Sequence, residues 1–286
     1  MKPAKSANSC WRWARHVSAA HEDAWRERLA DAGPALAVTG RPSSRVVRLE
    51  VYDASAAPLR RLARQFGGLV ERVDHAAIVA RANAPRKPVR IARDFVVLDA
   101  SGRLPAGTPR PRIVLRVGAA MAFGTGDHAT TASCLRLMHG LAAELPRGWT
   151  ALDVGTGSGI LAVAAEKLGA TRVMAFDNDE AAVRAAMANG RRNRCSRIVF
   201  ETRDLLRGRA PGGRHALVLA NVYSTILVEA APRLARTVAP GGFLVISGIL
   251  RGQLPATLDA FAAEGLEVER RILRGKWATA LLRRPA

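Results

Sequence analysis

The stretch Ala151-Leu-Asp-Val-Gly-Thr-Gly-Ser-Gly-Ile160 decides the fold of this chain of 286 residues. An apolar run ends in the acid Asp153, alternating glycines follow, and an Ala/Leu-rich segment then covers 160–168. A second apolar run leads to Asp177. The order predicts a strand, a tight turn, a helix and a second strand, because glycine tolerates the backbone conformations that such a turn requires.

The spacing of these glycines and acids separates two kinds of nucleotide cofactor. Dinucleotide-binding turns have the pattern G-x-G-x-x-G, whereas this turn, with Gly155 and Gly157, has G-x-G-x-G and places Asp153 two residues ahead of it. A carboxylate there repels a pyrophosphate and attracts the ammonium of a methionine-like group. Asp177, at the end of the next strand, suits ribose hydroxyls. The pattern therefore predicts S-adenosylmethionine between the glycine turn and the two carboxylates.

Composition limits the class of protein. Hydrophobic residues make up 49% of the chain, which is enough for a buried core, and no apolar run approaches the roughly 18 residues of a membrane span. The N-terminus lacks the apolar segment of a secretion signal. Cys10, Cys134 and Cys195 are too scattered for a disulfide frame or a zinc site. We therefore expect a cytoplasmic protein that binds no metal and no membrane.

The charge of the chain is open to two interpretations. Its formal net charge is +20, from 44 basic and 24 acidic residues, spread over both halves of the chain. Such a field favours nucleic acid or an acidic partner. A compositional habit explains it equally well, since 39 of the 44 basic residues are arginine. Charge alone does not make the protein a nucleic-acid enzyme.

The first 84 residues predict a small domain with the order β-α-β-β-α-β, which is that of a ferredoxin-like sandwich. Apolar alternation and glycine punctuation indicate strands over 11–17, 35–39, 45–52 and 69–73, and helices over 22–32 and 57–66. Residues 85–117 hold five prolines and a short strand candidate, Phe95-Val-Val-Leu98. We interpret them as a linker and lead-in ribbon that is semi-rigid where proline is dense.

Residues 118–286 predict a doubly wound, Rossmann-like α/β domain, because apolar strands and helices alternate along them. We expect strands over 151–154, 172–176, 197–201, 216–220 and 243–247, a helix over 226–238, and a sharp turn over 239–242. The closing runs 266–273 and 276–282 are separated by Arg274-Gly275, so tight a turn that they must form an antiparallel hairpin. A parallel sheet that ends in such a hairpin is typical of class I methyltransferases rather than dehydrogenases.

Several blocks of this sequence resemble the PrmA family, whose members methylate the eleventh protein of the large ribosomal subunit. The blocks occur in the family's order and spacing, and the likeness covers nearly all of residues 87–284. They are Phe123-Gly-Thr-Gly-Asp-His-Ala-Thr-Thr131, Leu152-Asp-Val-Gly-Thr-Gly-Ser-Gly-Ile-Leu-Ala162, Leu219-Ala-Asn-Val222, Pro240-Gly-Gly-Phe-Leu-Val-Ile-Ser-Gly-Ile-Leu250 and Gly275-Lys-Trp277.

The resemblance implies S-adenosylmethionine binding at Thr131, Gly155, Asp177 and Asn221. It also implies an N-terminal substrate-recognition domain on a mobile linker, and transfer of methyl groups to lysine side chains or an N-terminal amine of a ribosomal protein. The chain departs from the family in Thr156, where cysteine is commonest. It also departs over 222–226, where Asn221 is followed by Val-Tyr-Ser-Thr-Ile instead of Ile-Leu-Ala-Gly-Pro.

Asn221 is the candidate catalytic residue, because it ends the fourth strand at the edge where open α/β sheets bind ligands. An amide carbonyl there can accept hydrogen bonds from an amine and orient its lone pair. Tyr223 is a candidate wall for the acceptor, and Phe123 and His128 lie in the loop expected over the site. The hydroxyls of Thr130-Thr131 suit helix capping. Methyl transfer from a sulfonium mainly needs alignment and the exclusion of water, so no nucleophilic side chain is required.

Other functions remain to be weighed against a protein N-methyltransferase. The same fold could methylate another protein or a small molecule. RNA methylation ranks lower, because enzymes acting on base amines usually carry Asn/Asp-Pro-Pro-Tyr/Phe where this chain has Asn221-Val-Tyr-Ser224. A non-catalytic scaffold ranks last, since a scaffold has no need of Asp153, Asp177 and Asn221 together.

Overall fold

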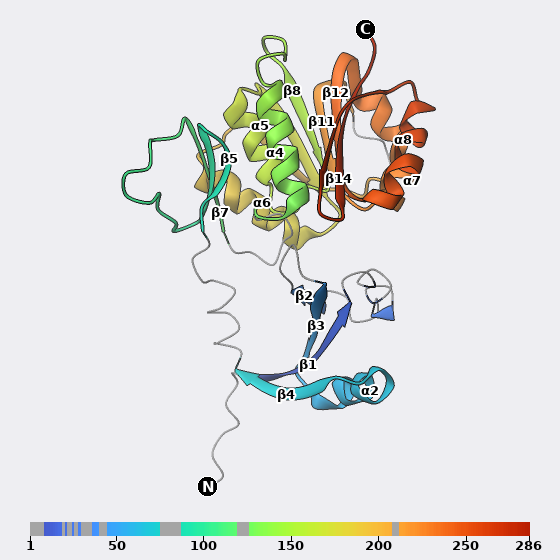
Figure 1. Ribbon diagram of the computed structural model, residues 1–286. Helices are drawn as coiled ribbons and strands as arrows, with labels where there is room; N and C mark the ends of the chain where they lie inside the picture. Colours follow the sequence, from blue (N-terminus) through green and yellow to red (C-terminus); the bar gives the residue numbers. More distant parts are fainter. Residues whose placement is uncertain are drawn as a thin grey trace. The chain divides into compact units, whose positions relative to one another are not determined.

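The computed structural model describes residues 9–18, 21, 25, 28–29, 36–39, 45–74, 87–118, 126–207 and 212–286. The chain divides into two compact units, Met1–Ala84 and Pro85–Ala286. Figure 1 shows the elements of each unit, coloured along the sequence.

The N-terminal unit is built on a four-stranded antiparallel sheet with the order β2-β3-β1-β4. This is the strand order of a ferredoxin-like domain, so the predicted class is confirmed. Helix α2 packs its Leu59 against Trp13 and Leu49 of the sheet. The predicted helix over 22–32 lies mostly outside the described residues. The elements are β1 (Ser9–Ser18), β2 (Leu36–Thr39), β3 (Val46–Asp53), α2 (Ala56–Phe66) and β4 (Leu69–Asp74).

The second unit contains a seven-stranded sheet with the order β10-β9-β8-β11-β12-β14-β13. Its strands are parallel except β14, which runs antiparallel to both neighbours. The doubly wound sheet and its closing hairpin are therefore as predicted. The strands are β8 (Thr150–Val154), β9 (Arg172–Asp177), β10 (Ile198–Thr202), β11 (His215–Asn221), β12 (Val238–Leu250), β13 (Glu267–Arg274) and β14 (Trp277–Arg283).

Helices cover both faces of this sheet (Figure 1). Because side chains alternate along a strand, Ala151 of β8 joins the core under α4 and α5, whereas Leu152 joins the core under α7 and α8. The helices are α4 (Ala129–Leu141), α5 (Ile160–Leu168), α6 (Glu180–Arg192), α7 (Ser224–Thr237) and α8 (Leu254–Ala262), with a short 3-10 turn η3 (Arg251–Gln253). No helix in the described residues has the length and apolar character needed to cross a membrane.

The segment interpreted as a linker and lead-in ribbon carries a three-stranded sheet of its own. Its strands are β5 (Val89–Ala92), β6 (Phe95–Asp99) and β7 (Ile113–Val117), of which β6 and β7 are parallel. Phe95 and Leu115 are fully buried in the same core as α4 and α5. Residues 87–118 are thus packed against the large sheet's helices within the second unit.

The prediction of a separate turn over 239–242, ahead of the strand, is wrong, because these residues lie inside the long strand β12. His215 pairs with Val238 and Leu217 pairs with Phe243, so the register shifts between the two pairs. The residues 239–242 therefore bulge opposite a single residue of β11, and Gly241 takes the positive φ of 71° that the bulge requires.

Candidate functional site

The glycine turn after β8 has the left-handed backbone that its sequence predicts. Gly155, Gly157 and Gly159 have φ of 64°, 53° and 77°, values that favour glycine strongly. A Cβ atom on Gly155 would also lie 2.4 Å from Cγ1 of Val222. The turn is therefore fixed both by backbone conformation and by the close approach of the chain that follows β11.

Asp153 is buried at the end of β8, with 1% of its surface exposed. Its Oδ2 accepts hydrogen bonds from Thr156 Oγ1 at 2.6 Å and from Ala162 N at 3.0 Å. Its Oδ1 has no partner within the described part of the chain. Burial, with a smaller contribution from the charge of Asp177, raises the pKa of Asp153 to about 7. One oxygen of Asp153 thus holds the turn, and the other can take a donor.

Asp177 ends β9 and braces the same turn from the neighbouring strand. Its Oδ2 accepts from Gly157 N at 2.9 Å, and its Oδ1 accepts from Asp179 N at 3.1 Å. The cap of α6 is Asp179, whose side chain accepts from Ala181 N at 2.7 Å. Asp177 is only half-buried, and each carboxylate oxygen accepts about two hydrogen bonds. Both oxygens therefore keep the capacity to hold a ligand.

Asn221 and Thr131 meet although 90 positions separate them in the sequence. Asn221 Nδ2 donates to Thr131 Oγ1 at 3.4 Å, and Thr131 is 1% exposed in the first turn of α4. Asn221 Oδ1 is buried and finds no partner among the described residues. The fold thus places a second unsatisfied acceptor at the end of β11, the strand beside β8.

His128, rather than a threonine hydroxyl, caps helix α4, which corrects the expectation for Thr130-Thr131. Its Nδ1 accepts from Thr130 N at 3.4 Å and lies 2.7 Å from Thr130 Oγ1. The imidazole ring packs edge-on against Trp277 of β14, with ring centroids 5.2 Å apart. His128 therefore ties the start of α4 to the closing hairpin.

The structure treats the three residues predicted to contact the substrate differently. Tyr223 precedes α7 and is 65% exposed, so its ring is available to a partner. His128 is held by the contacts with α4 and β14. Phe123 lies outside the described residues, so its role stays a prediction.

Val222 is a residue of the site that sequence reasoning missed. A Cβ atom on Gly248 of β12 would lie 2.4 Å from Val222 O, and a Cβ on Gly155 would meet the Val222 side chain. Val222 is therefore held between Gly155, which follows β8, and Gly248 of β12, and it fixes the chain between Asn221 and Tyr223. Gly248 could have indicated this contact from the sequence, because an isolated glycine inside a strand pattern often marks a place where another backbone segment approaches closely.

The order of the seven strands, the glycine turn and the acids at the strand ends define the class I methyltransferase fold. A solved structure, the ribosomal protein L11 methylase from Lactobacillus delbrueckii subsp. bulgaricus, superposes with a TM-score of 0.62 at 29% identity, covering 70% of this chain and 100% of that chain. The model of the family "Ribosomal protein L11 methyltransferase (PrmA)" matches residues 55–285. The chain belongs to this family.

Curated relatives agree with the family match. A ribosomal protein L11 methyltransferase of Chloroflexus aurantiacus is 40% identical over 201 residues, which cover 62% of this chain and 60% of that protein. One from Rhizobium rhizogenes is 39% identical over 217 residues, covering 72% and 70%. The match thus spans about three fifths of the length of the Chloroflexus relative.

Proposed function

We propose that this protein is an S-adenosylmethionine-dependent N-methyltransferase that methylates an amine of a ribosomal protein. The observation that carries the proposal is a pair of buried acceptors, Asp153 Oδ1 and Asn221 Oδ1, without partners in the described structure. They end two neighbouring strands of the sheet. A buried acceptor left without a donor costs about 1–3 kcal/mol, so both atoms favour a ligand that carries N–H groups.

The residues at the turn fit S-adenosylmethionine. Asp153 Oδ1 suits the ammonium of its methionine part, and Asp177 has lone pairs left for ribose hydroxyls. Gly155 and Gly157 keep side chains away from the turn, and Thr131 offers a hydroxyl at the start of α4. When bound, the cofactor supplies a methyl group on an activated sulfonium. The protein's part is to align the acceptor and to exclude water.

We assign to Asn221 the binding of the substrate amine that accepts the methyl group. The free carbonyl oxygen of Asn221 can accept a hydrogen bond from an N–H of the amine, which orients the nitrogen lone pair. A lysine amine has a reference pKa of about 10.4 and must lose its proton before it reacts, and desolvation favours the neutral form. Tyr223 offers an exposed aromatic wall at the mouth of the site. His128 holds the start of α4 against β14 through its contact with Trp277.

A ribosomal protein is the proposed substrate because the relatives are named ribosomal protein L11 methyltransferases. The N-terminal unit is the proposed recognition domain, since the cofactor and acceptor residues all belong to the second unit. An assay with labelled cofactor, the purified protein and ribosomal proteins tests this directly. Label that resists protease and is released by ribonuclease would show that the methyl acceptor is RNA and not protein.

Removal of Asp177 tests the cofactor site. We expect Asp177→Ala to weaken S-adenosylmethionine binding about tenfold or more in calorimetry, because a hydrogen bond to a charged group contributes about 1.5–3 kcal/mol. The matched control is Asp179→Ala, which removes the cap of α6 and lowers stability by about 1 kcal/mol without touching the proposed ligand. Equal affinities in Asp177→Ala and the wild type would remove Asp177 from the site.

Removal of the Asn221 amide tests the catalytic role. We expect Asn221→Ala to reduce kcat about a hundredfold, in line with the loss of one positioned polar group, while the cofactor Kd changes little. Steady-state methylation of a ribosomal protein and calorimetry on the same preparation separate the two effects. Undiminished turnover in this variant would exclude Asn221 from acceptor alignment.

A further inference from the structure

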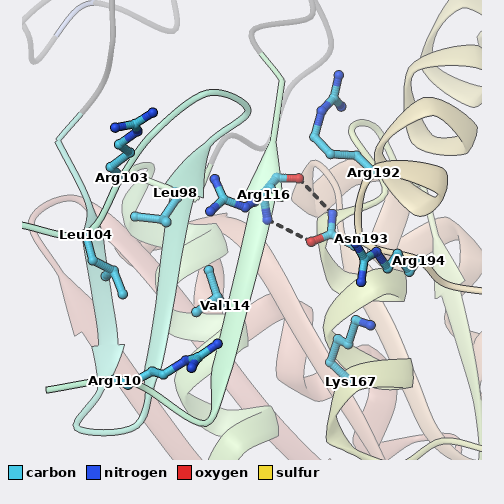
Figure 2. A pocket seen from close by; sticks show the side chains of 10 residues that line it. All are labelled: Leu98, Arg103, Leu104, Arg110, Val114, Arg116, Lys167, Arg192, Asn193 and Arg194. Carbon is cyan, nitrogen blue, oxygen red and sulfur yellow. Dashed lines mark hydrogen bonds between the residues drawn. The ribbon is translucent and has the colours of Figure 1, made fainter.

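A basic cavity of about 450 Å³ lies in the second unit, between strands β6 and β7 on one side and the C-terminal ends of α5 and α6 on the other. Figure 2 shows cationic side chains reaching it from both walls. Six of its lining residues are cations: Arg103, Arg110, Arg116, Lys167, Arg192 and Arg194. It lies at helix C-termini, whereas the candidate methyl-transfer site lies at the carboxyl ends of the strands, so the two sites are distinct.

No acidic side chain among the described residues neutralises the charge of this cavity. No aspartate or glutamate lines it, and none of its cations forms a salt bridge within the described ranges. Arg116 Nη1 donates to Gly102 O at 2.7 Å, and Arg192 Nη1 donates to Asn189 Oδ1 at 2.6 Å. These neutral acceptors hold the two guanidinium groups in place and leave their charge available.

Helix dipoles explain only part of the cluster. Lys167 and Arg192 lie in the last turns of α5 and α6, where a cation is favourable without any ligand. Arg103, Arg110 and Arg116 lie on or beside β6 and β7, on the opposite wall, and have no helix end to complement. A ligand with several negative charges accounts for both walls together.

Arg194 adds an independent observation. Its φ is 54°, and it is the sole non-glycine residue with positive φ in the described structure. It follows α6, at a position where glycine or asparagine normally accepts the left-handed conformation. Its N–H closes the helix end by donating to Arg191 O at 2.9 Å. The cavity is thus lined by arginine at position 194, although the backbone conformation there favours glycine.

The chemistry of the lining identifies the ligand class. Guanidinium groups pair with phosphates through two parallel hydrogen bonds. Among the residues that the structure describes, the lining has no aromatic residue on which a base could stack. The amide of Asn193 is already consumed, because it accepts from Arg116 N at 2.8 Å and donates to Arg116 O at 2.7 Å. The described lining therefore suits phosphate groups and offers no side chain that would distinguish one base from another.

We propose that this cavity binds the phosphate backbone of RNA, independently of base sequence. A run of phosphates matches cations on two walls, and the net charge of +20 steers a polyanion to the protein. The choice of RNA rests on the proposed function, because a ribosomal-protein substrate is assembled with RNA. The cavity binds this RNA as a partner and does not methylate it.

The test is fluorescence anisotropy of a labelled single-stranded RNA of mixed sequence, titrated with the full chain over a series of salt concentrations. For single strands the logarithm of affinity falls with slope about −0.7 per phosphate contact. The double variant Arg110→Gln/Arg194→Gly removes one cation from each wall. We expect it to lower affinity several-fold and to reduce the slope by about 1.4.

Two controls keep the result specific to the cavity. Arg191→Gln removes the same charge from the same end of α6 but lies outside the lining, and it should leave the slope close to that of the wild type. Arg194→Gly alone should keep or raise Tm, since glycine suits φ of 54°, so its weaker RNA binding cannot come from unfolding.

The outcomes that overturn the proposal are equally definite. They are absence of RNA binding by the wild-type chain, an equal loss in Arg191→Gln, or displacement of the RNA by polyglutamate as readily as by unlabelled RNA. Calorimetry with S-adenosylmethionine on the double variant should match the wild type. RNA binding is measured without activity, so its failure and the failure of the proposed methyl transfer are distinguishable.

Discussion

In the proposed function, the single side chain of Asp153 serves both the fold and a ligand. Its Oδ2 is fixed by Thr156 and Ala162, so the carboxyl group organises the turn in the unliganded protein. Thr156 places a hydroxyl donor here at 2.6 Å. The pKa of about 7 keeps Asp153 between its neutral and charged forms near neutral pH. A bound cation would shift it to the charged form.

The pKa of Asp153 predicts a pH-dependent stability. Its pKa in the folded protein, about 7, exceeds the ordinary value of 3.8, so the stabilising contribution is complete below about pH 4 and is lost as pH rises through about 7. Between about pH 5 and 8 this costs roughly 2–3 kcal/mol in the free energy of unfolding. Asp153→Asn cannot ionise and should flatten this part of the profile.

Urea unfolding of the unliganded wild type and of Asp153→Asn across that pH range measures the difference. The variant should gain stability relative to the wild type as pH rises. A gap between the two proteins that stays constant with pH would mean that Asp153 titrates normally, and the account of its burial would then be wrong.

At the scale of elements, Gly159 sets the distance between two helices. It begins α5 with φ of 77°, and a Cβ atom there would lie 2.8 Å from Ala186 Cβ and 2.9 Å from Ala186 Cα of α6. The glycine turn therefore does more than approach a ligand, because it also lets α6 pack directly on the start of α5.

Gly159→Ala tests this packing. We expect it to lower the free energy of unfolding by about 2–4 kcal/mol, from the left-handed backbone and the overpacking together. The matched control is Gly148→Ala, whose φ is 75° but whose Cβ would have nothing within 4 Å. The control should cost only about 1–2 kcal/mol. Adding Ala186→Gly to Gly159→Ala removes only the contact with Ala186 Cβ, so it should recover only part of the steric cost, because the contact with Ala186 Cα remains. Equal losses in the two single variants would contradict the contact.

Local sequence patterns predicted the helices and strands, but they could not predict contacts between residues that lie far apart in the sequence. The helix predicted over 160–168 coincides with α5, because its limits are set by neighbouring glycines. The contact of Thr131 with Asn221 spans 90 positions, and no periodicity encodes it. The cap of α4 was assigned to threonine hydroxyls, since histidine is an unusual cap. The packed sheet over 87–118 was missed because proline density suggested a linker.

At the scale of the whole molecule, each unit has its own hydrophobic core. Trp13, Leu49 and Leu59 form that of the N-terminal unit, and two larger clusters lie on the faces of the seven-stranded sheet. Separate cores allow the two units to fold separately. In the proposed function this separates two tasks, recognition of the acceptor protein by one unit and methyl transfer by the other.

Truncation to residues 85–286 tests that division of tasks. We expect the shortened chain to fold and to bind S-adenosylmethionine with unchanged affinity in calorimetry, because Asp153, Gly155 and Asp177 all remain. Methylation of the intact ribosomal protein should show a KM raised about a hundredfold, since the N-terminal unit no longer adds a second, tethered contact to the acceptor. The kcat at saturation should change much less.

A short peptide that carries only the acceptor amine is the matched control, because it reaches the site without the N-terminal unit and should react alike with both chains. If the intact protein kept its KM, recognition would have to reside in the second unit, where exposed Tyr223 is the first residue to test.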